Sequence, residues 1–114
     1  MLSACVLKDN SHFEIDPVYV DKLVITKIQR ESDTILKEQK VLSPGTEIFF
    51  IEKWNEAESV GMCKYLSNFE VDVILKSGRT RNFRINGSSI KEQNDFCYDT
   101  GDSDFGKNLW KNNH

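Results

Sequence analysis

The feature that most constrains this fold is a pair of strand-like segments around a Ser-Gly turn. "FEVDVIL", from Phe69 to Leu75, places alternate apolar residues on one face. "RTRNFRI", from Arg79 to Ile85, carries Phe83 and Ile85 at alternate positions. Such alternation is typical of strands with one buried face. The two segments therefore predict an antiparallel hairpin.

The length of the connecting loop fixes the register of this hairpin. A two-residue loop would place Val71 opposite Arg84 and so mix the apolar and polar faces. A three-residue loop over 76–78 instead places Val71 opposite Phe83. It also puts Gly78 at the left-handed position that such loops require. We therefore predict the three-residue loop.

This register divides the three arginines of the second strand into two groups. Arg84 lies opposite Glu70 on the outer face, where a cross-strand ion pair is expected. Arg79 and Arg81 lie on the core-side face at the turn end, and no partner across the hairpin is predicted to neutralise them. Arg84 is thus expected to be structural, whereas the other two are candidates for binding.

Residues 16–30 are compatible with either a helix or a strand. Asp16 followed by Pro17 is a common helix start. The segment is nevertheless rich in β-branched and aromatic residues, which lose rotamer freedom in helices and pack well on sheets. We favour a strand that turns at 31–33 and returns over 34–42.

The middle of the chain suggests a turn, a buried strand and an irregular segment. "SPGT" (43–46) has the residues of a tight turn. "EIFFIEKW" (47–54) is apolar on both faces, as expected of a central strand. Residues 55–68 give no clear pattern.

The C-terminal part begins with a second glycine turn at Asn86-Gly87. Ser89 and Glu92 then have the spacing of a capping box, which predicts a short helical turn. The segment 93–106 is acidic but includes aromatic residues, so part of it is expected to pack against the domain.

The order of these segments resembles an SH3-like barrel. The series of long hairpin, "PGTEIFFIEKW", irregular segment, "SGRTRNFRINGSSI" and helical turn covers roughly Leu23 to Ile90. The resemblance implies architecture only. The acidic, Tyr-rich opening strand, the paired tryptophans and the Pro-Tyr step of SH3 domains are absent, and Trp54 stands alone near the expected place. Binding of proline-rich motifs is therefore not expected.

Length and composition are consistent with one small folded domain. The chain has 114 residues, of which 39% are hydrophobic and 29% charged, which excludes a wholly disordered protein. The formal charge of −3 argues against a protein that coats nucleic acids without specificity. No apolar run is long enough to span a membrane. We expect a mainly β domain, a strongly bent antiparallel sheet or SH3-like barrel of about five strands with a short C-terminal helical segment. The first ~15 residues and the segment 93–106 are expected at its periphery.

The cysteines point to a reducing compartment. Cys5, Cys63 and Cys97 are widely spaced and odd in number, which favours free thiols and a cytoplasmic location. "LSAC" at Leu2–Cys5 is similar to a lipoprotein cleavage box. The charged and apolar regions that precede such a box are absent, so lipidation is not expected.

The sequence contains no convincing catalytic or metal-binding pattern. His12 and His114 are the only histidines, and no local signature joins either to a cysteine nucleophile. The sequence has no CxxC pair of the kind that indicates a zinc site. "DTGDSDFG" (99–106) lacks the glutamate that completes an EF-hand loop. We therefore expect no cofactor and no metal.

The remaining candidates are basic and aromatic. From Gly61 to Glu92 there are six basic and three acidic residues, a local excess of positive charge. We expect a non-enzymatic domain that binds a protein or peptide partner through its exposed turn end and edge strand. The alternative is nucleic-acid binding through the basic hairpin 76–91, and a small enzyme is the third possibility. The candidate binding residues are Arg79, Arg81, Trp54, Lys76 and Lys91.

Overall fold

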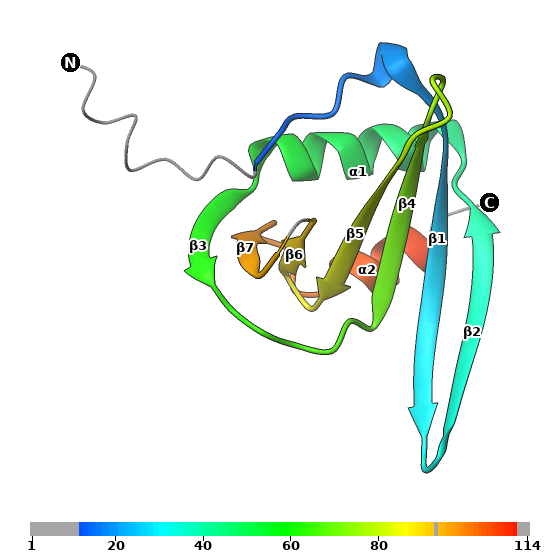
Figure 1. Ribbon diagram of the computed structural model, residues 1–114, viewed down its shortest axis with the longest axis vertical. Helices are drawn as coiled ribbons and strands as arrows, with labels where there is room; N and C mark the ends of the chain where they lie inside the picture. Colours follow the sequence, from blue (N-terminus) through cyan, green and yellow to red (C-terminus); the bar gives the residue numbers. More distant parts are fainter. Residues whose placement is uncertain (1–11, 93, 112–114) are drawn as a thin grey trace.

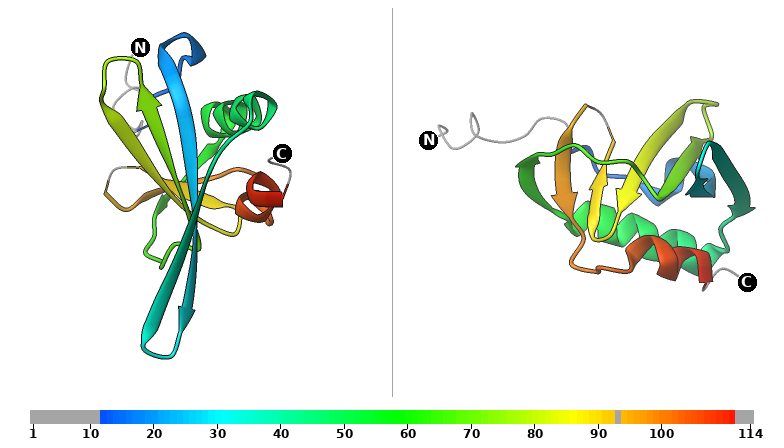
Figure 2. Two further views of the ribbon diagram at one scale, coloured as in Figure 1. Left: turned by 90° about the vertical axis from the view of Figure 1, so that its right-hand side faces the viewer. Right: turned by 90° about the horizontal axis from the view of Figure 1, so that it is seen from below.

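The computed structural model describes residues 12–92 and 94–111, so the Leu2–Cys5 segment and its lipidation lie outside the described residues. One antiparallel sheet has the strand order β2-β1-β4-β5-β6-β7-β3 (Figure 1). Two helices lie on the same side of this sheet (Figure 2). The strands are β1 (Val20–Glu31), β2 (Thr34–Val41), β3 (Glu58–Met62), β4 (Phe69–Leu75), β5 (Thr80–Asn86), β6 (Ser89–Lys91) and β7 (Phe96–Asp99). The helices are α1 (Pro44–Glu56) and α2 (Phe105–Lys111), preceded by a 3-10 turn at Pro17–Tyr19.

The prediction of a mainly β domain with a C-terminal helical segment is confirmed. The sheet has seven strands. It is not closed into a barrel, because β2 and β3 form two separate edges. The SH3-like barrel is therefore not confirmed. Within the described ranges, no helix has the length and apolar character needed to cross a membrane.

The β4–β5 hairpin has the predicted register. Val71 pairs with Phe83 and Phe69 with Ile85. The loop spans 76–78, and Gly78 has a φ of 94°. Val71 and Phe83 are both fully buried. Loop geometry and the buried face therefore agree on one register, as the alternation indicated.

The N-terminal segment forms the predicted hairpin rather than a helix. β1 and β2 are antiparallel, and Glu31 pairs with Thr34 around a two-residue turn in which Ser32 has a φ of 48°. β1 extends past its partner β4, whose pairing ends at Lys27. The rest of this hairpin projects as a two-stranded arm (Figure 1), and every residue of 29–41 is exposed.

The predicted strand at 47–54 is wrong, because this segment belongs to α1. Pro44 stands in the first turn of the helix, where its missing N–H costs nothing. The backbone N–H of Glu47 donates to the Ser43 carbonyl at 2.8 Å. Phe50 and Trp54 lie one turn apart and are fully buried. A short apolar run fits a buried helix as well as a buried strand, so its pattern alone could not decide.

The predicted helical turn at Ser89 is also wrong, because Ser89–Lys91 is strand β6. Asn86 pairs with Ser89 around a two-residue loop, in which Gly87 has a φ of 60°. Ile90 is fully buried between its partners on β5 and β7. Burial of Ile90 in the sheet thus overrides the capping-box spacing.

Some described residues of the two segments that we placed at the periphery pack into the core, as we expected for part of 93–106. Ile15 is 2% exposed, Tyr98 on β7 is 1% exposed and Phe105 at the start of α2 is fully buried. Their side chains join a cluster that includes Trp54 and Phe83. The core therefore lies between the sheet and the two helices and includes residues from both ends of the described chain.

The expectation of free thiols is wrong for two cysteines. Cys63 and Cys97 form a disulfide with their Cα atoms 6.0 Å apart. They are 34 residues apart in sequence, but β3 and β7 are neighbouring strands, which brings them together. Spacing along the chain gave no sign of this proximity. Cys5 lies outside the described residues.

Candidate functional site

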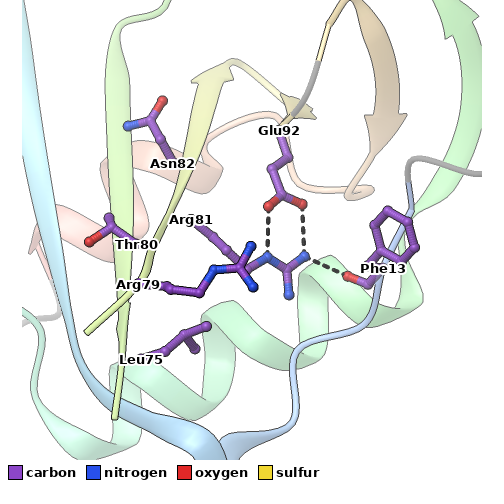
Figure 3. A pocket seen from close by; sticks show the side chains of 7 residues that line it. All are labelled: Phe13, Leu75, Arg79, Thr80, Arg81, Asn82 and Glu92. Atoms are coloured by element: carbon purple, nitrogen blue, oxygen red, sulfur yellow. Dashed lines mark hydrogen bonds and ion pairs between the residues drawn. The ribbon is translucent and has the colours of Figure 1, made fainter. Parts of the chain in front are cut away.

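A groove lies at the turn end of the β4–β5 hairpin (Figure 3). Its volume is about 500 Å³. It lies between β5 and the N-terminal segment that precedes the 3-10 turn. The lining residues are Phe13, Leu75, Arg79, Thr80, Arg81, Asn82 and Glu92.

One wall of the groove is an open strand edge. β6 pairs with β5 only at 84–86, so the first half of β5 has β4 on one side alone. The Leu75 N–H donates to the Arg79 carbonyl at 2.8 Å. Backbone groups alternate in direction along an antiparallel strand, so those of Thr80 and Asn82 point away from β4. No residue of 12–92 or 94–111 pairs with them on that side.

The opposite wall is a chain segment that α1 holds in place. The Trp54 indole N–H donates to the Phe13 carbonyl at 2.8 Å. The Asn55 side chain accepts from the Ile15 N–H at 2.8 Å and donates to the Ile15 carbonyl at 3.0 Å. Phe13 itself remains 54% exposed. These hydrogen bonds fix the backbone of the wall and leave an aromatic ring free beside the groove.

Arg81 connects the two walls. Its Nε lies 2.6 Å from Oε2 of Glu92, and its Nη2 lies 2.7 Å from Oε1, which makes a bidentate ion pair. The same guanidinium donates to the carbonyls of Phe13 at 2.7 Å and Glu14 at 3.1 Å. The side chains of Arg81 and Glu92 are only 19% and 7% exposed. We expected no partner for Arg81 across the hairpin, and its partner Glu92 indeed lies beyond the hairpin.

Arg79 differs from Arg81 although both are on the same face of the hairpin. It is exposed, and none of the ion pairs within the described chain involves it. Figure 3 shows its side chain extending into the groove. Because Glu92 offsets Arg81, Arg79 gives the groove a net positive charge.

Lys76, another candidate, lies in the turn at the end of the groove but does not line it. Its backbone N–H donates to the carbonyl of Tyr19 at 2.9 Å. The Tyr19 side chain is 64% exposed. The turn end therefore presents an aromatic ring and a lysine next to the groove.

Two other sequence candidates lie elsewhere. Trp54 is fully buried in the core. Lys91 is 2% exposed, and its Nζ lies 3.0 Å from a carboxylate oxygen of Asp95 and 4.2 Å from the Tyr65 ring centre. The hydrogen bond from Lys91 lowers the pKa of Asp95, and burial raises the pKa of the Tyr65 phenol, with Arg84 opposing. Neither candidate offers surface to a partner in this conformation.

Arg84 is structural, as expected, but through different partners. It lies opposite Glu70 in the register. Its Nη2 instead donates to the carbonyls of Asn94 at 2.7 Å and Glu92 at 3.3 Å. Glu70 accepts hydrogen bonds from Asn82 and Ser67 at 3.2 and 3.3 Å. The expected cross-strand ion pair is thus replaced by contacts from outside the hairpin.

Sequence reasoning missed the residues that complete the groove. Phe13 is 68 residues from Arg81 and belongs to no motif, and Glu92 had been assigned to a capping box. The edge at Thr80 and Asn82 depends on where β6 ends, which no local pattern indicates. The only available signal was one acidic residue, Glu92, directly after the basic stretch.

Comparisons with family models, curated proteins and solved structures find no match for this chain. Within the described residues, no group of three or more His, Cys, Asp or Glu side chains could hold a metal ion. The groove is therefore interpreted from its own geometry.

Proposed function

We propose that this chain is a non-enzymatic binding domain that holds a peptide segment of a partner protein in the groove. The observation that carries this proposal is the open edge at Thr80–Asn82, which forms a wall of the groove. Unpaired backbone donors and acceptors of a strand edge are a ready template for another chain.

The size and chemistry of the groove support a peptide as the ligand. Its volume of about 500 Å³ is within the range of roughly 300–1,000 Å³ that is usual for ligand pockets. Phe13 and Leu75 provide apolar contacts, and Arg79 provides one exposed charge. In such a groove, the polar groups fix the orientation of the ligand and the apolar groups bury part of its surface.

The basic hairpin gives less support to nucleic-acid binding. Arg81 and Lys91 are neutralised by carboxylates, and Arg84 donates to backbone carbonyls. Lys76 and Arg79 alone remain exposed among its basic residues. Binding to a phosphate backbone usually needs several cations at once. One exposed lysine and one exposed arginine are therefore a weak basis for it.

Selection from a displayed library of random linear peptides tests the proposal. We expect enrichment of related sequences that bind the purified protein. Arg79→Ala should weaken their binding by about tenfold or more, which corresponds to loss of a charge-assisted contact. Lys37→Ala is the matched control, because Lys37 is also exposed but lies on β2 at the edge of the sheet.

Two results would contradict the proposal. One is the absence of enriched sequences, and the other is an affinity that Arg79→Ala and Lys37→Ala change equally. Titration with a single-stranded oligonucleotide at low salt serves as a counter-test. Binding that is lost in Arg79→Ala and falls steeply with salt would favour the nucleic-acid alternative.

A further inference from the structure

We infer that the peptide joins the sheet as an added strand along Thr80–Asn82 and places a carboxylate against Arg79. This inference rests on the proposed function and specifies its mode of binding and its ligand class. The ligand is an extended, acidic segment of a partner protein.

The end of β6 defines the place for the added strand. β6 pairs with β5 from Arg84 to Asn86, in the order Lys91 to Ser89. Directly after β6, Glu92 turns its carboxylate to the guanidinium of Arg81 (Figure 3). The chain therefore leaves β5 at this point, and a guest strand would continue the line of β6 beside β5.

The backbone of β5 supplies the general part of recognition. The N–H and carbonyl groups of Thr80 and Asn82 point toward the groove. A guest strand can form hydrogen bonds with both residues. The N–H and carbonyl groups of every second guest residue would then point toward β5. Such pairing is independent of the guest's sequence, as in other strand-addition complexes.

The side chains supply the specific part. Arg79 and Arg81 lie on the same face of the hairpin, but Arg81 is already bound to Glu92. The groove therefore has one exposed cation, and it can form a bidentate pair with a carboxylate. Phe13, on the opposite wall, is 54% exposed and can contact an apolar neighbour of that carboxylate. Charge complementarity thus favours an acidic guest.

Backbone and side-chain substitutions in a selected peptide test the two parts separately. We expect N-methylation at alternate positions to weaken binding about tenfold or more, with little effect at the positions between. Replacing one acidic residue by its amide should weaken binding to the wild-type protein by a similar factor. The same replacement should have little effect on binding to Arg79→Ala, because the two groups act as a pair.

The outcomes distinguish this inference from the proposed function. Peptides that bind without an acidic residue would contradict the carboxylate contact with Arg79. Peptides that tolerate N-methylation at every position would contradict strand addition. Either result would still be consistent with a peptide-binding groove. Failure to select any peptide would overturn both. Arg79→Lys provides an internal check, because it keeps the charge but not the bidentate geometry. It should bind more weakly than wild type and more tightly than Arg79→Ala.

Discussion

The two long hairpins of this molecule are both antiparallel but have opposite surroundings. In β4–β5, the inward residues Val71, Val73, Phe83 and Ile85 are all fully buried under the helices. In the arm of β1–β2, Ile35 and Leu36 are 59% and 44% exposed. Alternation predicted the β4–β5 hairpin, whereas β-branched and aromatic composition favoured the β1–β2 hairpin. Whether a hairpin becomes core or arm depends on which other elements lie against it.

The arm therefore contributes little to stability, because a two-stranded ribbon without a third layer is marginal by itself. Its shape must depend on β1, whose first part is held against β4. The β4–β5 hairpin, in contrast, is paired on one side with β1 along its full length and touches both the core and the groove. Substitutions in the two hairpins should consequently differ most in their effect on unfolding.

The largest difference is expected for apolar truncations. Phe83→Ala should lower the free energy of unfolding by about 3–5 kcal/mol, because it leaves a cavity against the aromatic rings of Phe50 and Trp54. Leu36→Ala on the arm should change it by less than about 0.5 kcal/mol. Denaturant unfolding of both variants measures the contrast. Similar losses for the two variants would show that the arm is packed in solution.

The two edges of the sheet differ in crosslinking, because the β3 edge is next to a disulfide and β2 contains no cysteine. The β3 edge is joined to β7 through Cys63–Cys97, which closes a loop over a sequence separation of 34. In the chain-entropy estimate, such a crosslink contributes about 3–4 kcal/mol. Reduction, or the double substitution Cys63→Ser with Cys97→Ser, should lower the free energy of unfolding by this amount. Unfolding that is unchanged by a reductant would contradict the disulfide.

A smaller contrast lies within β5 itself. Arg81→Ala should destabilise the fold by about 2–3 kcal/mol, less than a fully buried pair, because its side chain is 19% exposed. Arg79→Ala should change stability by less than about 0.5 kcal/mol. The double substitution of Arg81 and Glu92 by alanine should recover part of the loss, because most of it comes from leaving Glu92 buried without a partner. Equal stabilities of Arg81→Ala and Arg79→Ala would contradict the ion pair at Arg81.

The sequence predicted those features that short segments determine. The register of 69–85 follows from loop length and alternation, and both are local. The helix at 44–56 was missed because Phe50, Ile51 and Trp54 fit either a helix or a central strand until the surrounding sheet is known. The disulfide was missed because neighbouring strands β3 and β7 are far apart in the chain.

The groove was only half predictable for the same reason. Arg79 and Arg81 could be placed at the turn end from the register alone. Their different roles depend on Phe13, 68 residues away from Arg81, and on Glu92. Charge and spacing gave the two arginines equal weight. The contacts from other elements left only Arg79 exposed.

Amide hydrogen exchange of the free protein tests most directly whether the first half of β5 is an open edge. In an antiparallel ladder, the amides of Arg81 and Phe83 donate to β4, whereas those of Thr80 and Asn82 face the groove. We therefore expect slow exchange at Arg81 and Phe83 and fast exchange at Thr80 and Asn82. Protection of Thr80 and Asn82 equal to that of Phe83 would mean that another segment already pairs with this edge. That result would contradict both the groove and the strand addition proposed for it.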